Sequence, residues 1–541
     1  MKPGREIRAT SPNPRRDLFR QQGVLADTLT WQLVAAAAAD RPRATAICDG
    51  ETRLDYAEYW ARSLRLVGSM QALGLGPGQS VVYQVPNWWE SLVVHQAVAA
   101  AGGVSVPVPT TFARRELLTV LEQVRPVMII VADHFRGVDL RTQMQDVAVE
   151  LGLEVPLVVV RPAAPGSESD LAALLGPDVE CGCPVPRAPD DICAVIYTSG
   201  STSVPKGVLH THEALVHEVR SRVAPFSLNR DDSVFMPSSL AHIAGLSYGV
   251  HLPALLGIPV VLQEVWDPPA AAELIERHGC TVMNGVTVML AGLVDAYERR
   301  QSDSTLRVFA CGGAPIGTEL VRRATERLGA HVTRAYGCSE FPTLTWSTPG
   351  TDLHRVTSTE GRLVDHTCAR VVDSTGSPVE TGAVGELEAF GPERCVGYLD
   401  ATLNAELFTD DGWVRTGDLA SLDADNYLTI RGRKKDIIVR AGENISAAEI
   451  EAILRERDEV LDVAVLAVPD PVVGERACAV LQVPPGAEVT VATVARWMAE
   501  SGLSKRKWPE VVHCLHDLPR TSSGKVAKTA LLDVVLQGQE I

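Results

Sequence analysis

Short runs made up mainly of apolar residues, two of them continuous, recur along the first third of the chain and are separated by segments with helical spacing. These runs are Ser80–Val85, Val104–Val108, Val127–Ala132 and Leu157–Val160. A strand that is apolar on both faces has to be covered on both faces, which favours a parallel or mixed sheet with helices packed against it. Between strand-like runs, Leu54–Leu73 carries apolar residues at helical spacing and stops before Gly74. The sequence therefore predicts an α/β fold.

The predicted secondary-structure pattern changes in the later part of the chain. A second α/β stretch covers residues 191–345, and short strands broken by glycines after residue 360 indicate a β-rich subdomain. From about residue 436 the pattern predicts a compact α+β unit, with a helix over Ala447–Arg457 and strands over Val460–Val468 and Ala477–Val483. A chain of 541 residues is too long for one ordinary domain. We expect a basic flexible tail over 1–25, a large N-terminal domain over 26–433 and a small C-terminal domain over 434–541.

Charge and cysteine usage narrow the function classes. The formal net charge of -17 argues against binding to nucleic acid or to anionic membranes. The 11 cysteines are scattered, and the close pair Cys181 and Cys183 has no second pair to complete a metal site, so free thiols are expected. No apolar run reaches the ~18 residues of a membrane span. Together with the absence of a signal peptide, these features predict a cytoplasmic protein.

The strongest local signal is the segment Tyr197–Gly207, which follows the apolar run Ile192–Ile196. It offers a cluster of hydroxyls and a glycine to an anion: Thr198, Ser199, Gly200, Ser201 and Thr202. Lys206 adds a positive charge near its end, and His210–Val219 is expected to form the next helix. The spacing differs from a Walker P-loop. A polar surface turn is the alternative, but the hydroxyls and the placed lysine favour phosphate binding.

This loop resembles that of the adenylate-forming superfamily, which includes acyl-CoA synthetases, adenylation domains and beetle luciferases. Ser203 stands where that family usually has glycine. Further segments resemble the family's motifs in matching order: Gly312–Pro315, Tyr336–Glu340, Trp413–Leu419, Arg431–Asp436, Ala441–Ser446 and Pro519–Val526. The resemblance covers roughly residues 30–535 and implies a large N-terminal domain followed by a small, mobile C-terminal domain.

The resemblance also implies the nucleotide-binding residues. ATP is expected to lie on the hydroxyl loop and on the following residues: Gly313, Ala314, Pro315, Tyr336, Gly337, Asp418 and Arg433. A carboxylate such as Asp418 can accept from both ribose hydroxyls. Mg²⁺ is expected on Thr198 and Glu340, because a magnesium ion that bridges phosphates needs few protein oxygens.

Catalytic and acceptor-site residues follow by the same resemblance. The catalytic set is Lys525, Glu340, Lys206 and His242. Lys525 is expected to hold the reacting carboxylate and the α-phosphate, and Lys435 is expected to be the hinge of the C-terminal domain. Residues implied to line a coenzyme A tunnel are Ala441, Gly442, Glu443 and Asn444. Without the other motifs, Arg431–Asp436 would be interpreted as a solvated charge run.

The expected substrate is an uncharged carboxylic acid. Pro237–Gly245 and Lys507–Glu510 resemble the branch of medium-chain and alicyclic acid CoA ligases, and the expected pocket walls are His242, Asn284, Gly285 and Gly312. The segment Leu240–Ala244 contains no carboxylate to pair with an amino acid's ammonium. The predicted activity is ATP-dependent acid–thiol ligation through an acyl-adenylate, with coenzyme A as acceptor. Loading of a carrier protein, amide formation and a non-catalytic binding homologue remain alternatives.

Overall fold

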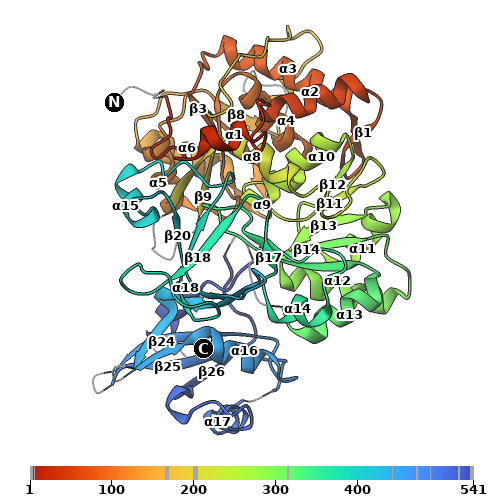
Figure 1. The fold of residues 1–541 in the computed structure, drawn as a ribbon. Helices are drawn as coiled ribbons and strands as arrows, with labels where there is room; N and C mark the ends of the chain where they lie inside the picture. Colours follow the sequence, from red (N-terminus) through yellow and green to blue (C-terminus); the bar gives the residue numbers. More distant parts are fainter. Residues whose placement is uncertain are drawn as a thin grey trace.

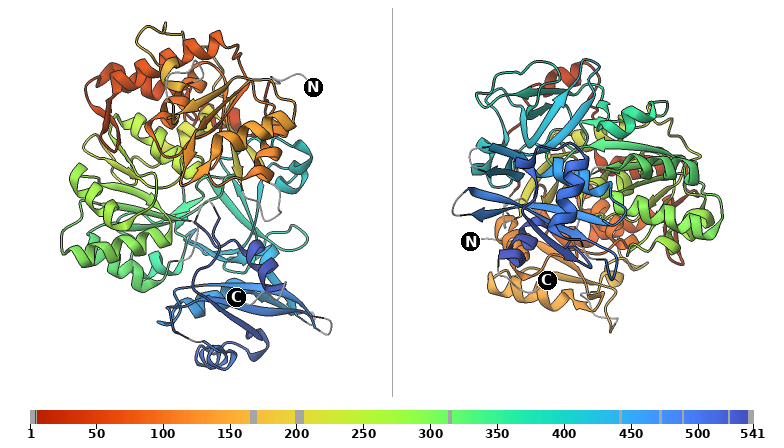
Figure 2. Two further views of the ribbon diagram at one scale, coloured as in Figure 1. Left: turned by 180° about the vertical axis from the view of Figure 1, so that it is seen from behind. Right: turned by 90° about the horizontal axis from the view of Figure 1, so that it is seen from below.

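The computed structural model describes residues 4, 6–164, 170–198, 205–312, 316–440, 443–470, 473–487, 489–521 and 524–536. The chain forms a large lobe and a smaller C-terminal lobe, which is coloured blue and lies below the rest in Figure 1. Seen from below, the small lobe lies over the middle of the large one (Figure 2). The predicted α/β class with a smaller α+β C-terminal domain is confirmed, whereas the predicted boundary at residue 434 stays a prediction.

Most of the apolar runs of the first third lie in a six-stranded sheet. Its spatial order is β10 (Lys206–Thr211), β9 (Ile192–Thr198), β4 (Val104–Pro107), β3 (Ser80–Gln84), β5 (Met128–Ala132) and β8 (Leu157–Val160). All neighbours pair in parallel except β9 and β10. Every residue of β3, β4 and β5 is buried, as expected for strands covered on both faces.

A second sheet has nine strands among the described residues. Their order is β17 (Arg362–Leu363), β16 (Thr345–Trp346), β15 (His331–Tyr336), β14 (Val308–Gly312), β13 (Val282–Gly285), β11 (Val234–Met236), β12 (Val260–Leu262), β1 (Thr45–Asp49) and β2 (Thr52–Asp55). The strands from β15 to β1 are parallel, and the strands at either edge are antiparallel.

Helices cover these sheets in layers. The helices α4 (Trp89–Ala100) and α8 (His212–Arg220) are buried almost all round, and their apolar residues belong to a core that includes strands of both sheets. A separate core joins the nine-stranded sheet to α11 (Pro268–His278), α12 (Thr287–Arg300) and α13 (Thr318–Leu328), which lie together at one side of the large lobe (Figure 1). The two cores place the nine-stranded sheet inside the lobe.

The glycine-rich segment after residue 360 forms the predicted β-rich subdomain. Its antiparallel sheet contains β18 (Cys368–Val372), β19 (Gly385–Phe390), β20 (Val414–Leu422) and β21 (Leu428–Arg433). The C-terminal lobe has a sheet of β22 (Ile437–Arg440), β23 (Glu443–Ser446), β24 (Asp462–Asp470), β25 (Gly474–Gln482) and β26 (Val511–Leu515). Its helices are α16 (Ala447–Arg455), α17 (Val491–Glu500) and α18 (Lys528–Leu536). No helix in the described residues combines the length and apolar character that a membrane crossing requires.

The expectation of a loose N-terminal tail is wrong for residues 6–25. Thr10 bonds to the backbone of Val396 through its amide at 3.0 Å, and the Asn13 side chain donates to the Gly391 carbonyl at 2.9 Å. Helix α1 (Arg16–Gln21) buries Phe19 beside Phe390. The basic residues suggested a solvated tail, but two of them, Arg16 and Arg20, form ion pairs with acidic side chains of the large lobe.

Candidate active site

The parallel strands β13, β14 and β15 have their carboxyl ends at the same end of the nine-stranded sheet. The register pairs Gly285 at the end of β13 with Cys311, and Gly312 at the end of β14 with Ala335. A Cβ at Gly312 would stand 3.1 Å from the Ala335 carbonyl oxygen, so glycine relieves crowding between these strands. Ligands of such sheets bind beyond the carboxyl ends of the strands. The expected wall residues Asn284, Gly285 and Gly312 are thus brought together.

The turn that carries His242 lies against the same strand ends. Ser238 donates from its hydroxyl to the Asn284 carbonyl at 3.2 Å. His242 is half-buried and directly precedes the short helix α9 (Ile243–Leu246). Gly245 is required there, because a Cβ would stand 2.0 Å from the Ser239 carbonyl oxygen. The structure therefore places His242 on an element that contacts the predicted acyl wall.

Asp418 joins two of the predicted motifs. The Tyr336 hydroxyl donates to Asp418 Oδ2 at 2.5 Å, and Arg433 Nε donates to Asp418 Oδ1 at 3.0 Å. Burial is the larger cause, and the Asp418 charge the second, of a raised pKa of Tyr336. The phenol therefore keeps its proton and stays a hydrogen-bond donor. Asp418 is only 5% exposed. Each carboxylate oxygen has a second lone pair, so both remain able to accept a ribose hydroxyl.

The turn after Tyr336 needs its glycine and presents Glu340. A Cβ at Gly337 would stand 1.9 Å from the Pro342 carbonyl oxygen. Glu340 Oε1 accepts a 2.6 Å hydrogen bond from Tyr398, whose ring centroid lies 5.1 Å from Lys206 Nζ. Tyr398 was missed by sequence reasoning, because a tyrosine directly after a glycine is typical of any turn. It links two of the predicted catalytic residues.

Lys206 opens a strand, where the sequence led us to expect loop and then helix from His210. Strand β10 pairs antiparallel with β9, and its register sets Lys206 opposite Thr198. His210 and Thr211 belong to β10 and are buried, so pairing in the sheet overrides the helical pattern at these two residues; α8 begins at His212. The Thr198 hydroxyl and the Glu340 carboxylate are hard oxygen donors of the kind that Mg²⁺ prefers, so the residues fit the expected ion.

Lys525 comes from the C-terminal lobe and reaches the same groups. The pKa of Lys525 is lowered mainly by burial among protein atoms and secondly by the positive charge of Arg433. The negative charges of Asp418 and Glu340 act in the opposite direction and raise it. Solvent nevertheless reaches the residue. The preceding Gly524 would bring a Cβ to 3.5 Å from Val286, at the start of the α12 helix. Charges from three other motifs, carried by Arg433, Asp418 and Glu340, therefore act on one ammonium.

The expected hinge lies between the lobes. Lys435 is exposed and belongs to a single turn of 3₁₀ helix, Lys434–Asp436, between β21 and β22. Across this turn the Ser446 hydroxyl donates to the Arg431 carbonyl at 2.8 Å, and Lys434 pairs with Glu386. These contacts hold the small lobe against the large one in the arrangement described.

Several predicted residues lie outside the described part of the chain. They are Ser199, Gly200, Ser201, Thr202, Ser203, Gly313, Ala314, Pro315, Ala441 and Gly442. The backbones of Glu443 and Asn444 form part of β23. Roles for all of these residues stay predictions.

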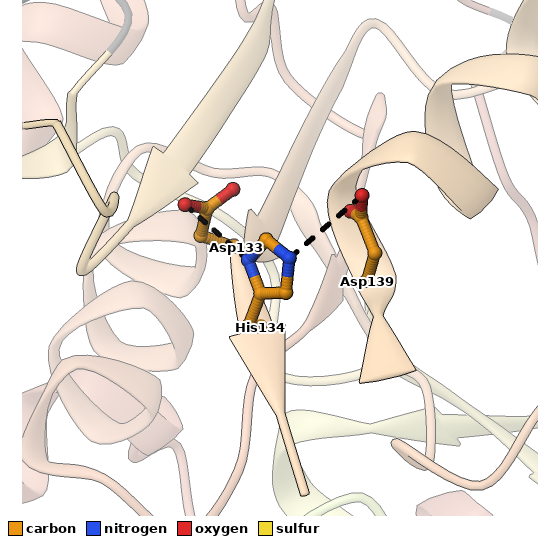
Figure 3. Close-up of side chains that lie close together, drawn as sticks. All are labelled: Asp133, His134 and Asp139. Atoms are coloured by element: carbon orange, nitrogen blue, oxygen red, sulfur yellow. Dashed lines mark ion pairs between the residues drawn. The ribbon is translucent and has the colours of Figure 1, made fainter. Parts of the chain in front are cut away.

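The described residues contain one further group of potential metal ligands. Asp133, His134 and Asp139 lie on and beside the β6–β7 hairpin (His134–Phe135 and Val138–Asp139), as Figure 3 shows. Asp139 caps helix α6 (Leu140–Glu150) by accepting from the Thr142 amide and hydroxyl, and Asp133 accepts from the Ala163 amide at 2.7 Å. These bonds explain the cluster without an ion.

Comparison with known proteins places these motifs in a known context. The family described as "AMP-binding enzyme" matches residues 34–399, and the family described as "AMP-binding enzyme C-terminal domain" matches residues 449–525. A medium-chain fatty-acid–CoA ligase of Escherichia coli K12 is 32% identical over 536 residues, covering 97% of this chain and 94% of that protein. A Streptomyces protein named salicylyl-CoA synthase / salicylate adenylyltransferase is 32% identical over 506 residues, covering 91% and 90%.

The fold has close counterparts among solved structures. The ATP-bound crystal structure of MatB from Rhodopseudomonas palustris superimposes with a TM-score of 0.83 at 28% sequence identity. The match covers 94% of this chain and 99% of MatB, so both lobes take part in it.

Proposed function

The chain belongs to the AMP-binding enzyme family, and we propose that within it the protein is an acid–thiol ligase that couples ATP cleavage to thioester formation. Its carboxylic acid is first converted to an acyl-adenylate with release of pyrophosphate, and the acyl group then passes to coenzyme A. The observation that supports this most directly is the convergence of Lys525, Arg433 and Glu340 on the Tyr336–Asp418 pair.

The first step is mainly an electrostatic problem. A carboxylate oxygen attacks the α-phosphorus, the bond to the β-phosphate oxygen breaks, and pyrophosphate leaves with the negative charge. In this proposal Lys525 lies between the carboxylate and the α-phosphate, where its charge offsets their repulsion. Lys206 and the hydroxyl loop hold the β- and γ-phosphates. Thr198 and Glu340 would hold Mg²⁺, which when bound neutralises phosphate charge.

The nucleoside is held by the buried polar group at the β20–β21 edge. Asp418 accepts from the ribose hydroxyls, and its orientation is fixed by the donors Tyr336 and Arg433. The Tyr336 ring and the segment Gly313–Pro315 take the adenine. Because Asp418 is buried, water competes poorly for these hydrogen bonds.

The second step needs Lys525 withdrawn and a thiol admitted. The thiol sulfur attacks the acyl carbon, the bond to the AMP oxygen breaks, and the thiol proton is released. Rotation about Lys435 would remove the Lys525 turn and bring the segment Ala441–Asn444 to the site. The Ser446–Arg431 hydrogen bond would have to break in this movement. Coenzyme A is the proposed acceptor; a carrier-protein phosphopantetheine is the second candidate.

The acid is proposed to be a medium-chain, alicyclic or aryl acid. His242 and the strand ends Asn284, Gly285 and Gly312 form its walls, and each buried methylene contributes about 0.8 kcal/mol. The Escherichia coli relative supports a medium chain, and the Streptomyces relative supports an aryl acid. An amino acid would bury its ammonium without a partner in the segment Leu240–Ala244.

The test is pyrophosphate release over a panel of acids, with and without coenzyme A. The panel runs from acetate to dodecanoate and adds cyclohexanecarboxylate, benzoate, leucine and phenylalanine. Apolar acids should be turned over and the two amino acids should not. Competition between coenzyme A and a phosphopantetheinyl carrier protein identifies the acceptor. Absence of pyrophosphate release with every acid would overturn the proposal in favour of a non-catalytic binding protein.

A further inference from the structure

The turn that carries Lys525 belongs to the small lobe, although the groups around the lysine belong to the large one. At the base of the turn, the Ala527 amide donates to the Pro519 carbonyl at 2.7 Å. Further in, the Thr521 amide donates to the Lys525 carbonyl at 2.7 Å, and the Gly524 amide donates to the Thr521 carbonyl at 2.9 Å. These bonds set the shape of the turn, but each of them lies within it. Its orientation relative to the rest of the lobe depends on other contacts.

Arg520, at the start of this turn, bonds it to the sheet of the small lobe. Its Nη2 donates to Asp462 Oδ2 at 3.0 Å and to Gln482 Oε1 at 3.2 Å. Asp462 is the first residue of β24 and Gln482 is the last residue of β25, and the two are register partners at the end of that strand pair. The guanidinium is therefore bonded to the regular part of the lobe.

The same guanidinium also reaches the residue before the lysine. Arg520 Nη1 donates to the Gly524 carbonyl at 3.2 Å. This carbonyl belongs to the planar peptide group that links Gly524 to Lys525, so holding it fixes the plane from which Lys525 continues. Gly524 has a φ of +82°, which favours glycine, and the chain therefore changes direction here. Three bonds from one planar side chain thus connect the peptide beside the lysine to the end of the β24–β25 pair.

Apolar packing alone would leave the direction of the turn open. Leu518 is 1% exposed, and both Leu518 and Val526 pack in the apolar cluster that lies against β24 and β25. Apolar burial is non-directional, so it keeps the two ends of the turn in the lobe without fixing where the tip points. The directional bonds of Arg520 supply that orientation. Its side chain is 28% exposed, and that of Asp462 is 18% exposed, so water reaches these bonds only in part.

Adenylation makes a strict demand on the position of Lys525, because a displacement of about 1 Å can cost roughly 100-fold in rate. We propose that Arg520 is a positioning residue for adenylation: by joining the Gly524 carbonyl to the end of the β24–β25 pair, it directs Lys525 toward the nucleotide site. This rests on the proposed function and adds a residue to its first step. Because Lys525 has left the site in the second step, thioester formation does not need Arg520.

Two variants of Arg520 test the role. Arg520→Gln removes the guanidinium, and we expect kcat for pyrophosphate release to fall by at least about tenfold while KM for ATP and for the acid changes by less than about twofold. Thioester formation from supplied acyl-adenylate should keep the wild-type rate. Arg520→Lys keeps the charge and the long stem but cannot form the three bonds of the planar fork, so its loss should be intermediate.

The matched control is Arg457→Gln in the same lobe. Arg457 donates to Glu500 Oε2 at 3.0 Å and to the Trp497 carbonyl at 3.1 Å, and its side chain is 25% exposed. It therefore also joins a carboxylate to a backbone carbonyl, but its partners lie on α17, at the foot of the small lobe in Figure 1. This variant should leave both half-reactions unchanged. Adding Asp462→Asn to Arg520→Gln should cost little further activity, because the two residues act as one unit.

The comparison of half-reactions decides between positioning and a general structural role. Equal losses in both half-reactions of Arg520→Gln would overturn the proposal, and so would a wild-type rate of pyrophosphate release in both Arg520 variants. Deuterium exchange separates this inference from the proposed function: peptides covering residues 519–527 should exchange faster in Arg520→Gln than in the wild type or in Arg457→Gln. If the wild type releases no pyrophosphate with any acid, the ligase proposal fails, and faster exchange would still identify Arg520 as the anchor of the turn. Unchanged exchange would overturn that role as well.

Discussion

Replacing Tyr336 by Phe removes one hydroxyl from the nucleotide site and leaves the ring in place. That hydroxyl donates the 2.5 Å hydrogen bond to Asp418, which is 5% exposed. A hydrogen bond to a charged group contributes about 1.5–3 kcal/mol. Because Tyr336 is itself only half-buried, we take the lower end, about 1.5 kcal/mol. That free energy corresponds to roughly a tenfold change in an equilibrium constant.

Asp418 keeps the hydrogen bond from Arg433 in the variant but loses one of the two donors that orient it. We therefore expect KM for ATP to rise roughly tenfold while KM for the acid stays constant. The free energy of unfolding should fall by about 1.5 kcal/mol. Pyrophosphate release against ATP at saturating acid, and urea denaturation of the same samples, measure the two effects.

The control is Tyr59→Phe, which removes a buried hydroxyl that donates to the Leu92 carbonyl at 3.2 Å. It should lower stability and leave both KM values unchanged. A wild-type KM for ATP in Tyr336→Phe would refute the role of this hydrogen bond in nucleotide binding. Equal rises of KM for ATP and for the acid would refute its restriction to the nucleotide.

Three further predictions concern the small lobe. Lys525→Ala should abolish adenylate formation from acid and ATP but spare thioester formation from supplied acyl-adenylate; Lys505→Ala, on an exposed turn, should change neither. Lys435→Pro fixes φ at about -65° and should reduce thioester formation more than adenylation; equal losses would argue against a hinge. Adenylation needs a charged Lys525, and the pKa of this lysine is lowered by burial and by Arg433. The adenylation rate should therefore fall with rising pH at a lower pH than the one at which an ordinary lysine loses its proton. Arg433→Gln should move this decline to higher pH, and an unmoved or lowered midpoint would contradict the assignment.

Much of the fold was predictable because the strands are short and apolar throughout. The run Val127–Ala132 differs from β5 by one residue, and Leu157–Val160 coincides with β8. Each run follows a proline and is too short for an ordinary helix, and both features favour a buried strand. The strand β10 was missed because His210 and the residues after it fit a helix, and only pairing with β9 decides between the two.

The site was predictable where a motif has reactive groups and fixed spacing. Asp418 and Arg433 lie on adjacent strands, and their register brings together residues that are separated in sequence by a turn. Tyr398 could not be found in this way. It follows Val396 and Gly397, and its partner Glu340 is 58 residues away in sequence. Only tertiary structure pairs the two.

The docking of the N-terminal segment has a consequence for the order of folding. The hydrogen bonds between Thr10 and Val396 join positions 386 residues apart. Ribosomes add about 5–20 residues per second, so the segment around Thr10 is synthesised roughly 20–80 s before Val396, its hydrogen-bond partner. Closing so long a loop is also an entropically late event. Phe19 and its neighbours therefore stay exposed throughout most of translation. The N-terminal segment packs against the large lobe in one of the last steps of folding.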